Sequence, residues 1–247
     1  MNKLYKTMLG ASMLMLSTFS LASVITLDAT VRDFRDTHPD FEQGPIFGLQ
    51  TGLVGSQLGP DGKPVYVGGP SLSTAASFNQ WYNDVAGVNQ SISITLDAAE
   101  TAPGSGIYTY SNSSYFPING MGFGNEGRSN NYHFTTEINS LFTYVAGQSF
   151  SFTGDDDVWV FINGELVVDL GGIHGPATRS VNLDTLGLVA GTDYTLDIFH
   201  AERRTVGSNF NFTTSAVLRS AQVSAPSTLL LVLLSIAGVA YTRKRKS

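Results

Sequence analysis

The sequence predicts an all-β protein, an antiparallel β-sandwich with long loops. Several segments alternate polar and apolar residues with a period of two, which is typical of half-buried strands. Glycine is frequent, with 26 in 247 residues, and no strongly periodic helix separates the strand segments. Aromatic residues make up 11% of the chain and charged residues 14%, a composition that supports a packed core. These observations favour two packed antiparallel sheets.

The first part of the mature chain contains few strand signals. Residues 28–44 are polar with spaced aromatic residues, and frequent Gly and Pro predict a long loop region over residues 44–70. Residues 73–85 predict a short helix. Its aromatic residues fall on one face at helical spacing: Phe78, Trp81 and Tyr82. Such a face is either core or a ligand platform, and we favour the core.

Regular alternation begins near residue 91. It predicts half-buried strands at residues 91–96, 149–153, 194–198 and 209–212. Residues 158–162 (VWVFI) are apolar on both faces and predict a central strand, with Trp159 in the sandwich core or close to its rim. Asn163 and Gly164 are a strong hairpin signal and predict a type I′ turn before a returning strand at residues 165–170.

Residues 1–22 predict a secretory signal peptide. Lys3 and Lys6 form a basic start, and residues 8–21 are apolar and uncharged. Ala22 lies in the small-residue context after which signal peptidase cleaves. An N-terminal membrane anchor is the alternative, but the apolar stretch is short for a span. We therefore expect an exported protein with a single mature domain over residues 23–222.

Residues 223–247 predict a C-terminal sorting or anchor segment containing a short apolar helix. Apolar residues 229–241 are marginal as a membrane span and precede a basic cluster at residues 243–246. This arrangement resembles the PEP-CTERM signal that exosortases process in Gram-negative bacteria, with Ser-Ala-Pro in place of the usual Pro-Glu-Pro. The resemblance implies transient retention at the inner membrane and cleavage by an exosortase-type protease; a plain tail anchor is the alternative. The matching sorting residues are Pro226, Ser227 and Thr228.

The charge of the predicted mature domain limits its partners. Six of the 14 basic residues lie in the two ends, so 8 remain against 20 acidic residues, a net charge of −12. Such a surface repels nucleic acid and anionic lipid, and suits multivalent cations and neutral polymers. The chain has no cysteine, which excludes disulfides, thiolate zinc sites and a cysteine nucleophile.

The densest negative charge in the sequence is Asp155, Asp156 and Asp157, directly before the central strand. Three adjacent carboxylates repel one another, and a calcium ion would relieve that repulsion because it takes six to eight oxygen ligands. An ordinary acidic turn is the alternative, since Asp favours turns.

A second polar group of residues lies further along the chain. Its members are Asp169, His174, His200, Glu202 and Arg203. His200 and Glu202 share a face if their strand continues, and with His174 they could ligate zinc. They could equally form a hydrogen-bonded network that supports the loops, and we favour the network.

Long motifs resemble a known family. The stretches GDDDVWVFINGELVVDLGGIH, VNLDTLGL and LDIFHAERRTVGSNFNF resemble the fibro-slime domain, as do VRDFRDTHPDFE, DGKPVY, FNQWYNDVAGVN, FPINGMGFGN and NYHFTTEI upstream. The resemblance covers residues 25–215. The fibro-slime domain is in turn similar to the β-sandwich domain named after anthrax protective antigen.

The resemblance implies a calcium-dependent sugar site. In lectin members of the protective-antigen type, two consecutive aspartates joined by a cis peptide hold calcium, and the calcium chelates vicinal sugar hydroxyls. Here that pair falls on Asp155 and Asp156, while the role of Asp157 stays open. The lectins complete the site with an Asn and backbone carbonyls of a later loop, for which Asn209 and Asn182 are candidates.

The sequence contains no GxSxG, HExxH or phosphate-binding glycine loop with lysine, so we expect no enzyme. We expect a calcium-dependent carbohydrate-binding or adhesion module at the cell surface or in the extracellular matrix of a Gram-negative bacterium. Its partners would be a carbohydrate or exopolysaccharide, with signal peptidase acting during export. A structural matrix protein with no specific sugar ligand is the alternative.

Overall fold

The computed structural model describes residues 22–42 and 48–221. The predicted signal peptide, up to residue 21, and the sorting segment from residue 223 lie outside the described residues. The described chain forms strands β1 (Val24–Phe34), β2 (Asn89–Glu100), β3 (Tyr108–Asn112), β4 (Phe134–Thr143), β5 (Ser149–Asp155), β6 (Asp157–Ile162), β7 (Glu165–Leu170), β8 (Ala177–Asn182), β9 (Asp193–Glu202), β10 (Asn209–Thr214) and β11 (Arg219–Ser220). Helical structure is limited to α1 (Ala75–Phe78) and the 3₁₀ turn η1 (Leu183–Leu186) within the described ranges.

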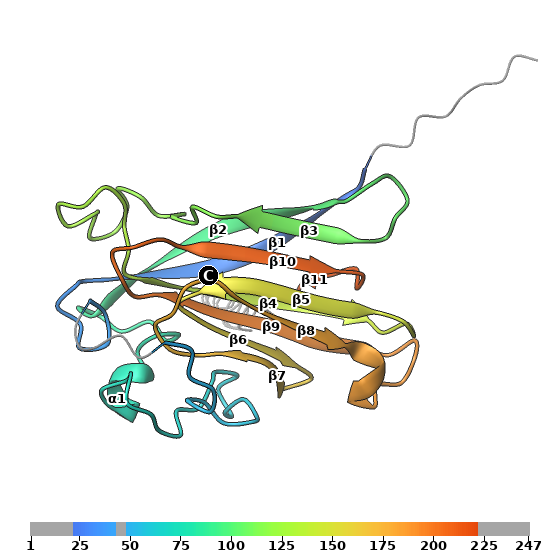
Figure 1. The fold of residues 1–247 in the computed structure, drawn as a ribbon, viewed down its shortest axis with the longest axis horizontal. Helices are drawn as coiled ribbons and strands as arrows, with labels where there is room; N and C mark the ends of the chain where they lie inside the picture. Colours follow the sequence, from blue (N-terminus) through green and yellow to red (C-terminus); the bar gives the residue numbers. More distant parts are fainter. Residues whose placement is uncertain (1–21, 43–47, 222–247) are drawn as a thin grey trace, which may run out of the picture.

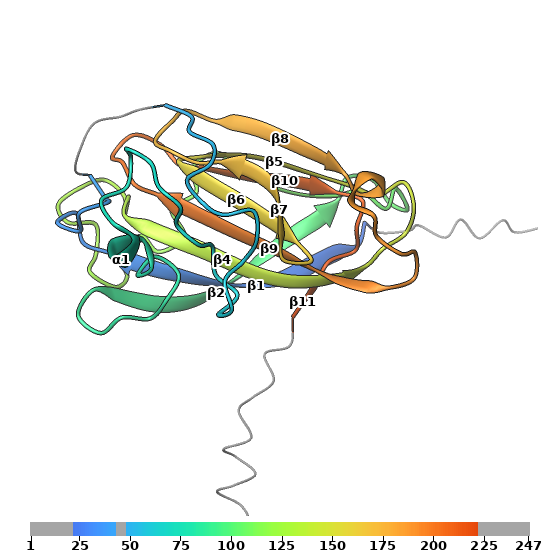
Figure 2. The ribbon, with the colours of Figure 1, turned by 90° about the horizontal axis from the view of Figure 1, so that it is seen from below.

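The strands form one 11-stranded antiparallel sheet that folds back on itself. The order is β7-β6-β9-β4-β1-β2-β3-β10-β5-β8, with β11 added beside β4. Figure 1 and Figure 2 show β10, β5 and β8 stacked over the layer that contains β1, β4 and β9. The all-β antiparallel prediction is confirmed, but the two expected sheets are one continuous sheet that turns between β2 and β3.

The main core fills the space between the two layers. Because successive side chains of a strand point to opposite faces, every second residue enters this core. Leu27 and Ile138 come from one layer, and Phe152, Phe210 and Phe212 come from the other. Because every second side chain is buried in this core, the strands are recognisable in the sequence as segments that alternate polar and apolar residues.

A second core lies on the outer face of β6 and β9. It is covered by the described parts of the chain between β1 and β2, residues 35–42 and 48–88, here called the cover segment. Figure 2 shows this segment, with α1, crossing the strands from outside. The predicted burial of Trp159 is confirmed, but the ring lies in this second core and not between the two layers. Both faces of β6 are covered, which is why its residues 158–162 are all apolar.

The predicted hairpin is confirmed, and the predicted helix is shorter than expected. β6 pairs with β7 through Asn163 and Gly164, whose φ values of 53° and 77° are both positive, as a type I′ turn requires. Helix α1 has only four residues of the 13 expected. The Asn89 amide donates to the carbonyls of Gln80 and Asn83, at 2.8 Å each, so these carbonyls bond a side chain instead of a continued helix.

Five strands were not predicted from the sequence: β1, β3, β4, β8 and β11, of which β1 and β4 are the longest. Residues 28–34 were read as polar, yet β1 alternates between buried and exposed residues over most of its length. In β4, six of the first eight positions are buried and none of the eight is exposed, because the cover segment and the second layer both approach it. A strand buried on both faces shows no period of two.

Candidate functional site

A pocket of about 340 Å³ opens at the end of the sandwich where β5 passes into β6. It collects residues from three places that are distant in sequence: the β5–β6 junction, the loop after β7 and the loop between β9 and β10. The lining residues are Asp155, Asp156, Ile173, His174, Gly175, Pro176, Arg204, Val206, Gly207 and Asn209. We call it the Asp155 pocket.

Asp155 and Asp156 are both buried, with 6% and 5% of their surface exposed. The Asp155 carboxylate accepts hydrogen bonds from the Asn209 backbone N–H at 2.6 Å and from the Asn209 amide at 2.9 and 3.2 Å. Asp156 Oδ2 accepts from the backbone N–H of Arg203 at 3.0 Å. The peptide bond between the two aspartates is cis.

Asp157 faces away from this pocket and is fully buried. Its Oδ2 pairs with Arg203 Nη1 at 3.0 Å, and its Oδ1 accepts from the Gly172 N–H at 2.5 Å. Arg203 also donates through Nε to the Asp40 carbonyl at 2.9 Å and through Nη2 to the Ser71 carbonyl. The pair therefore ties the cover segment to the strand that carries the aspartates.

Buried negative charge exceeds buried positive charge around the pocket. Burial raises the pKa of Asp155, with the Asn209 hydrogen bonds opposing it, and burial with the charge of Asp157 raises the pKa of Asp156 well above its usual range. Burial and the charge of Asp156 likewise raise the pKa of Glu202. Arg203, the buried cation at this site, is committed to Asp157. The environment thus disfavours ionised carboxylates unless a counter-charge is supplied.

The second predicted group of residues is divided by the structure. His174 lines the Asp155 pocket, whereas His200, Glu202 and Arg203 are buried outside the pocket lining. His200 donates through Nε2 to the Asp155 carbonyl at 2.8 Å and packs against Phe210, and burial lowers its pKa to about 4. His200 is therefore a neutral residue of the main core at ordinary pH.

The zinc site that the sequence left open as the alternative to a hydrogen-bonded network is not formed by these residues. In residues 22–42 and 48–221, no group of three or more His, Asp or Glu side chains is positioned to hold a metal ion. His200 faces the main core, so it cannot join the exposed side of His174 in one coordination shell. A cation at Asp155 and Asp156 would need amide and backbone oxygens as its further ligands, which calcium accepts.

Asn182 lies far from the pocket. It pairs with Ser149, six residues along β5 from Asp155, which is about 20 Å at the rise of a strand. Its side chain accepts from the Asp184 N–H at 3.0 Å and caps η1. Asn209, the other Asn candidate, pairs directly with Asp155 across β5 and β10.

Several lining residues were not expected from the sequence. They are Ile173, Gly175, Pro176, Arg204, Val206 and Gly207. In the sequence they are distinguished only by their position in the loops that follow β7 and β9. Val206, with 83% of its surface exposed, and Pro176 are apolar residues of the pocket lining.

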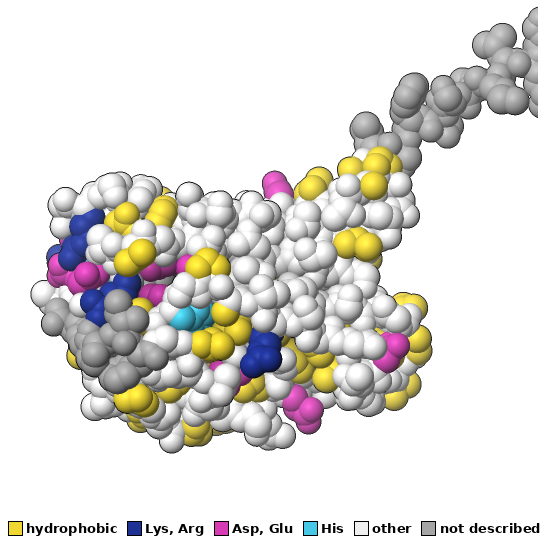
Figure 3. Space-filling model, viewed as in Figure 1, with side chains coloured by type: hydrophobic (Ala, Val, Ile, Leu, Met, Phe, Trp, Pro, Cys, Tyr) yellow, Lys and Arg dark blue, Asp and Glu magenta, His cyan; other side chains and the backbone are white. Residues whose placement is uncertain are grey.

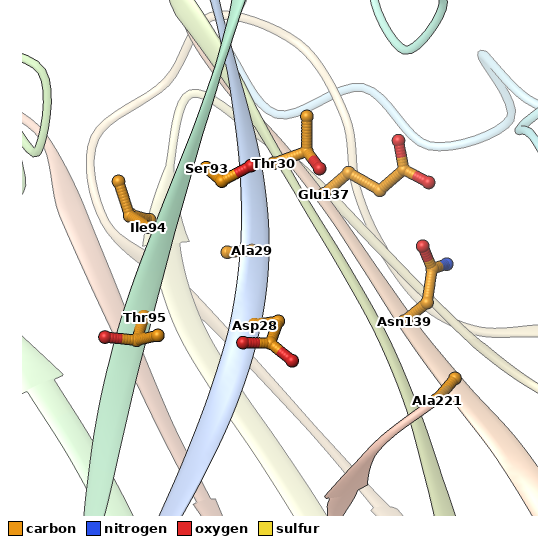
Figure 4. Close-up of a pocket in the computed structure, with 9 residues that line it drawn as sticks. All are labelled: Asp28, Ala29, Thr30, Ser93, Ile94, Thr95, Glu137, Asn139 and Ala221. Atoms are coloured by element: carbon orange, nitrogen blue, oxygen red, sulfur yellow. The ribbon is translucent and has the colours of Figure 1, made fainter. Parts of the chain in front are cut away.

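A larger groove of about 500 Å³ lies elsewhere, on the outer face of the sheet. Figure 4 shows its side chains on the adjacent strands β2, β1 and β4, including Ser93, Thr30 and Glu137. The buried Glu137 carboxylate is paired with Arg32 at 2.8 Å and with Lys63. Its charge is already compensated, unlike that of the aspartates in the Asp155 pocket.

Charged side chains are unevenly distributed over the molecule. Figure 3 shows acidic and basic groups gathered at the end that carries α1, while most of the same face is uncharged. Within the described residues, no helix is long and apolar enough to cross a membrane.

Comparison with known proteins adds a domain family and a set of relatives. Residues 125–228 match the PA14 domain. The matched part of this chain contains all the strands from β4 to β11 and the whole Asp155 pocket. The resemblance to the protective-antigen type is supported by this match. The fibro-slime and PEP-CTERM resemblances stay predictions.

The chain is similar to several proteins of Dictyostelium discoideum. Protein psiQ is 41% identical over 212 residues, which cover 79% of this chain and 22% of psiQ. Protein psiD is 40% identical over 216 residues, covering 78% of this chain and 42% of psiD. The chain thus spans less than half the length of these relatives.

Solved structures with distant similarity include two PA14 domains. The PA14 sugar-binding domain from an RTX adhesin gives a TM-score of 0.38 at 11% identity, over 80% of this chain and all of that domain. The PA14 domain of the MpAFP antifreeze protein gives 0.37 at 10% identity, over 85% of this chain and 89% of that domain.

Proposed function

We propose that this protein is a calcium-dependent carbohydrate-binding or adhesion module that acts outside the cell. The observation that carries the proposal is the pair of buried, adjacent carboxylates of Asp155 and Asp156 at one pocket, without a cation of their own. The PA14 match over this region and the sugar-binding relative of that type agree with the proposal.

The residues of the pocket fit a calcium ion by their chemistry. Asp155 and Asp156 supply hard carboxylate oxygens, and the Asn209 amide would present its oxygen after a half turn about its last bond. The buried Glu202 Oε2 forms no hydrogen bond, so the local network has spare acceptor capacity. A bound calcium would supply the counter-charge that these groups lack and a centre for vicinal sugar hydroxyls.

The protein itself shapes the rest of the site. Arg203 holds Asp157 and, through its backbone, Asp156, so it positions the acidic pair without entering the pocket. Val206 and Pro176 offer an apolar wall against the C–H face of a sugar ring. In this proposal Asp157 is a structural residue, and His174 lies at the pocket wall as a polar neighbour of the ligand.

The wider setting is also proposed. We expect export by the segment at residues 1–22 and surface or matrix retention by the segment at residues 223–247, with Pro226, Ser227 and Thr228 at its processing site. The relatives described above come from Dictyostelium discoideum and give no support to a Gram-negative source, which stays a prediction. The absence of enzymatic activity stays a prediction too.

Two measurements on the purified protein test the proposal. A calcium-saturated sample should unfold at higher temperature than one in chelator, with a gain of about 2.7 kcal/mol at a hundredfold excess over Kd. A glycan array should give signals that chelator removes. Asp156→Asn should lose most of both effects, whereas Asp97→Asn, an exposed carboxylate on β2, should keep them. Identical melting in calcium and chelator would refute the metal site, and calcium stabilisation without any glycan signal would favour the structural matrix protein.

A further inference from the structure

His133 lies directly before β4, with its side chain 2% exposed, between two glutamates. Its Nε2 is 3.0 Å from Glu42 Oε2, and its Nδ1 is 3.3 Å from Glu126 Oε2. Ionised carboxylates only accept hydrogen bonds. Both ring nitrogens therefore need a proton to face both carboxylates favourably, and an imidazolium satisfies this arrangement.

Glu42 links this ion pair to the Asp155 pocket. The same Oε2 accepts from the Thr205 N–H at 3.1 Å and from Thr205 Oγ1 at 2.7 Å. The Glu42 carbonyl accepts from Arg204 Nη1 at 2.9 Å, and the Glu42 N–H donates to the Arg203 carbonyl at 2.9 Å. Residues 203–208 form the loop that supplies Arg204, Val206 and Gly207 to the pocket, so Glu42 fastens one of its walls.

The backbone at the two glutamates supports a specific role. Among the described residues, three non-glycine residues have positive φ: Asn163 in its hairpin turn, Glu42 at 54° and Glu126 at 50°. Non-glycine residues rarely adopt this region, and such conformations concentrate at functional sites. Here they bring two carboxylates to one buried imidazole.

We infer that His133 is a positioning residue for the Asp155 pocket, acting through Glu42 on the loop at residues 203–208. This inference rests on the proposed function. Loss of the imidazole proton turns a lone pair toward one carboxylate and weakens the hold on Glu42. Replacing the imidazole should therefore loosen the loop at residues 203–208.

Other charged groups lie around His133. They determine the pH below which Glu42 loses its charge, and they provide control substitutions. They are Asp33 on β1, Arg35 and Asp36 after it, Arg128 beside Glu126, and Arg204 on Glu42. Burial alone would raise the pKa of Glu42, but hydrogen bonds from His133 and Thr205 outweigh it and lower the pKa. Glu42 thus loses its charge only at acidic pH, where its contribution is lost.

Asp33 is a neighbouring buried carboxyl and provides a control for His133. Burial raises the pKa of Asp33 to about 6, against hydrogen bonds from Asn131 and Phe123. Those bonds hold residues 123–131 and not Glu42. Asp33→Asn is therefore a control that removes one titration and leaves the path from His133 to Thr205 intact.

Hydrogen exchange of residues 203–208 at a single pH tests the inference without any ligand. Protection should be about tenfold lower in His133→Gln than in the wild type, the scale of an ordinary coupling between sites. Glu42→Gln should lower the protection to the same extent, and Asp33→Asn should keep the wild-type protection. The partly exposed Glu42 makes its substitution safe for folding.

Calcium ions alone serve as the second probe. By calorimetry, the calcium affinity of His133→Gln should be weaker than that of the wild type, and that of Asp33→Asn should match it. Protection of residues 203–208 that is unchanged in both His133→Gln and Glu42→Gln would overturn the inference while leaving calcium and glycan binding untouched. Protection that depends on His133 in a protein that binds neither calcium nor glycan would keep the loop mechanism and refute the proposed function.

Discussion

Trp159→Ala should destabilise the protein and release the cover segment. The ring is fully buried against Phe78 at 5.7 Å and Trp81 at 6.2 Å between centroids, and its Nε1 donates to Asp169 at 3.1 Å. Burying such a ring removes about 150–250 Å² from water, worth roughly 4–6 kcal/mol as an upper limit at 25 cal/mol per Å². Measured Trp→Ala substitutions in cores cost about 3–5 kcal/mol, which we expect here.

Thermal unfolding and hydrogen exchange together check this prediction. The loss of unfolding free energy should lower Tm by roughly 6–20 °C for a domain of this size. Because the ring packs against the cover segment and not between the two layers, exchange should rise first in residues 48–88, while β1 and β5 stay protected. A cost below about 1 kcal/mol, or equal loss of protection in the strands of both layers, would refute the assignment of Trp159 to a separate outer core.

Three further substitutions test local features. Gly164→Ala should cost about 1–2 kcal/mol from its φ of 77° alone, since nothing lies within 4 Å of an added Cβ; an unchanged unfolding free energy would exclude the type I′ turn. Gly154→Ala should cost more, because its Cβ would lie 2.6 Å from Phe152 and 2.8 Å from the Asn209 carbonyl, and it should also weaken calcium binding at the adjacent Asp155. His200→Phe should flatten the acid limb of stability: burial lowers the His200 pKa to about 4, so its contribution of roughly 3 kcal/mol is complete above pH 6.5 and lost as pH falls toward 4. An acid limb identical to that of the wild type would show that His200 is not buried in its neutral form.

The candidate site was only partly readable from the sequence. Asp155 and Asp156 stood out because adjacent charges beside a buried strand are unusual, and Asn209 followed from its place in a later strand. Asp157 belonged to the same run, but strand geometry sends it to Arg203 on the far side. The roles of Glu42 and His133 had no signal, since they are 91 residues apart in the chain.

What the sequence determined by itself is the local structure. Period-two alternation, the Asn163-Gly164 turn and the charge of −12 depend on neighbouring residues or on composition. The strands β2, β5, β6, β7, β9 and β10 and the acidic character therefore followed directly. Only the tertiary structure decided that one sheet forms both layers, that the cover segment builds a second core around Trp159, and that the pocket joins three distant loops. These features arise from contacts between residues far apart in the chain, and a local pattern carries no information about which distant surface will bury a given face.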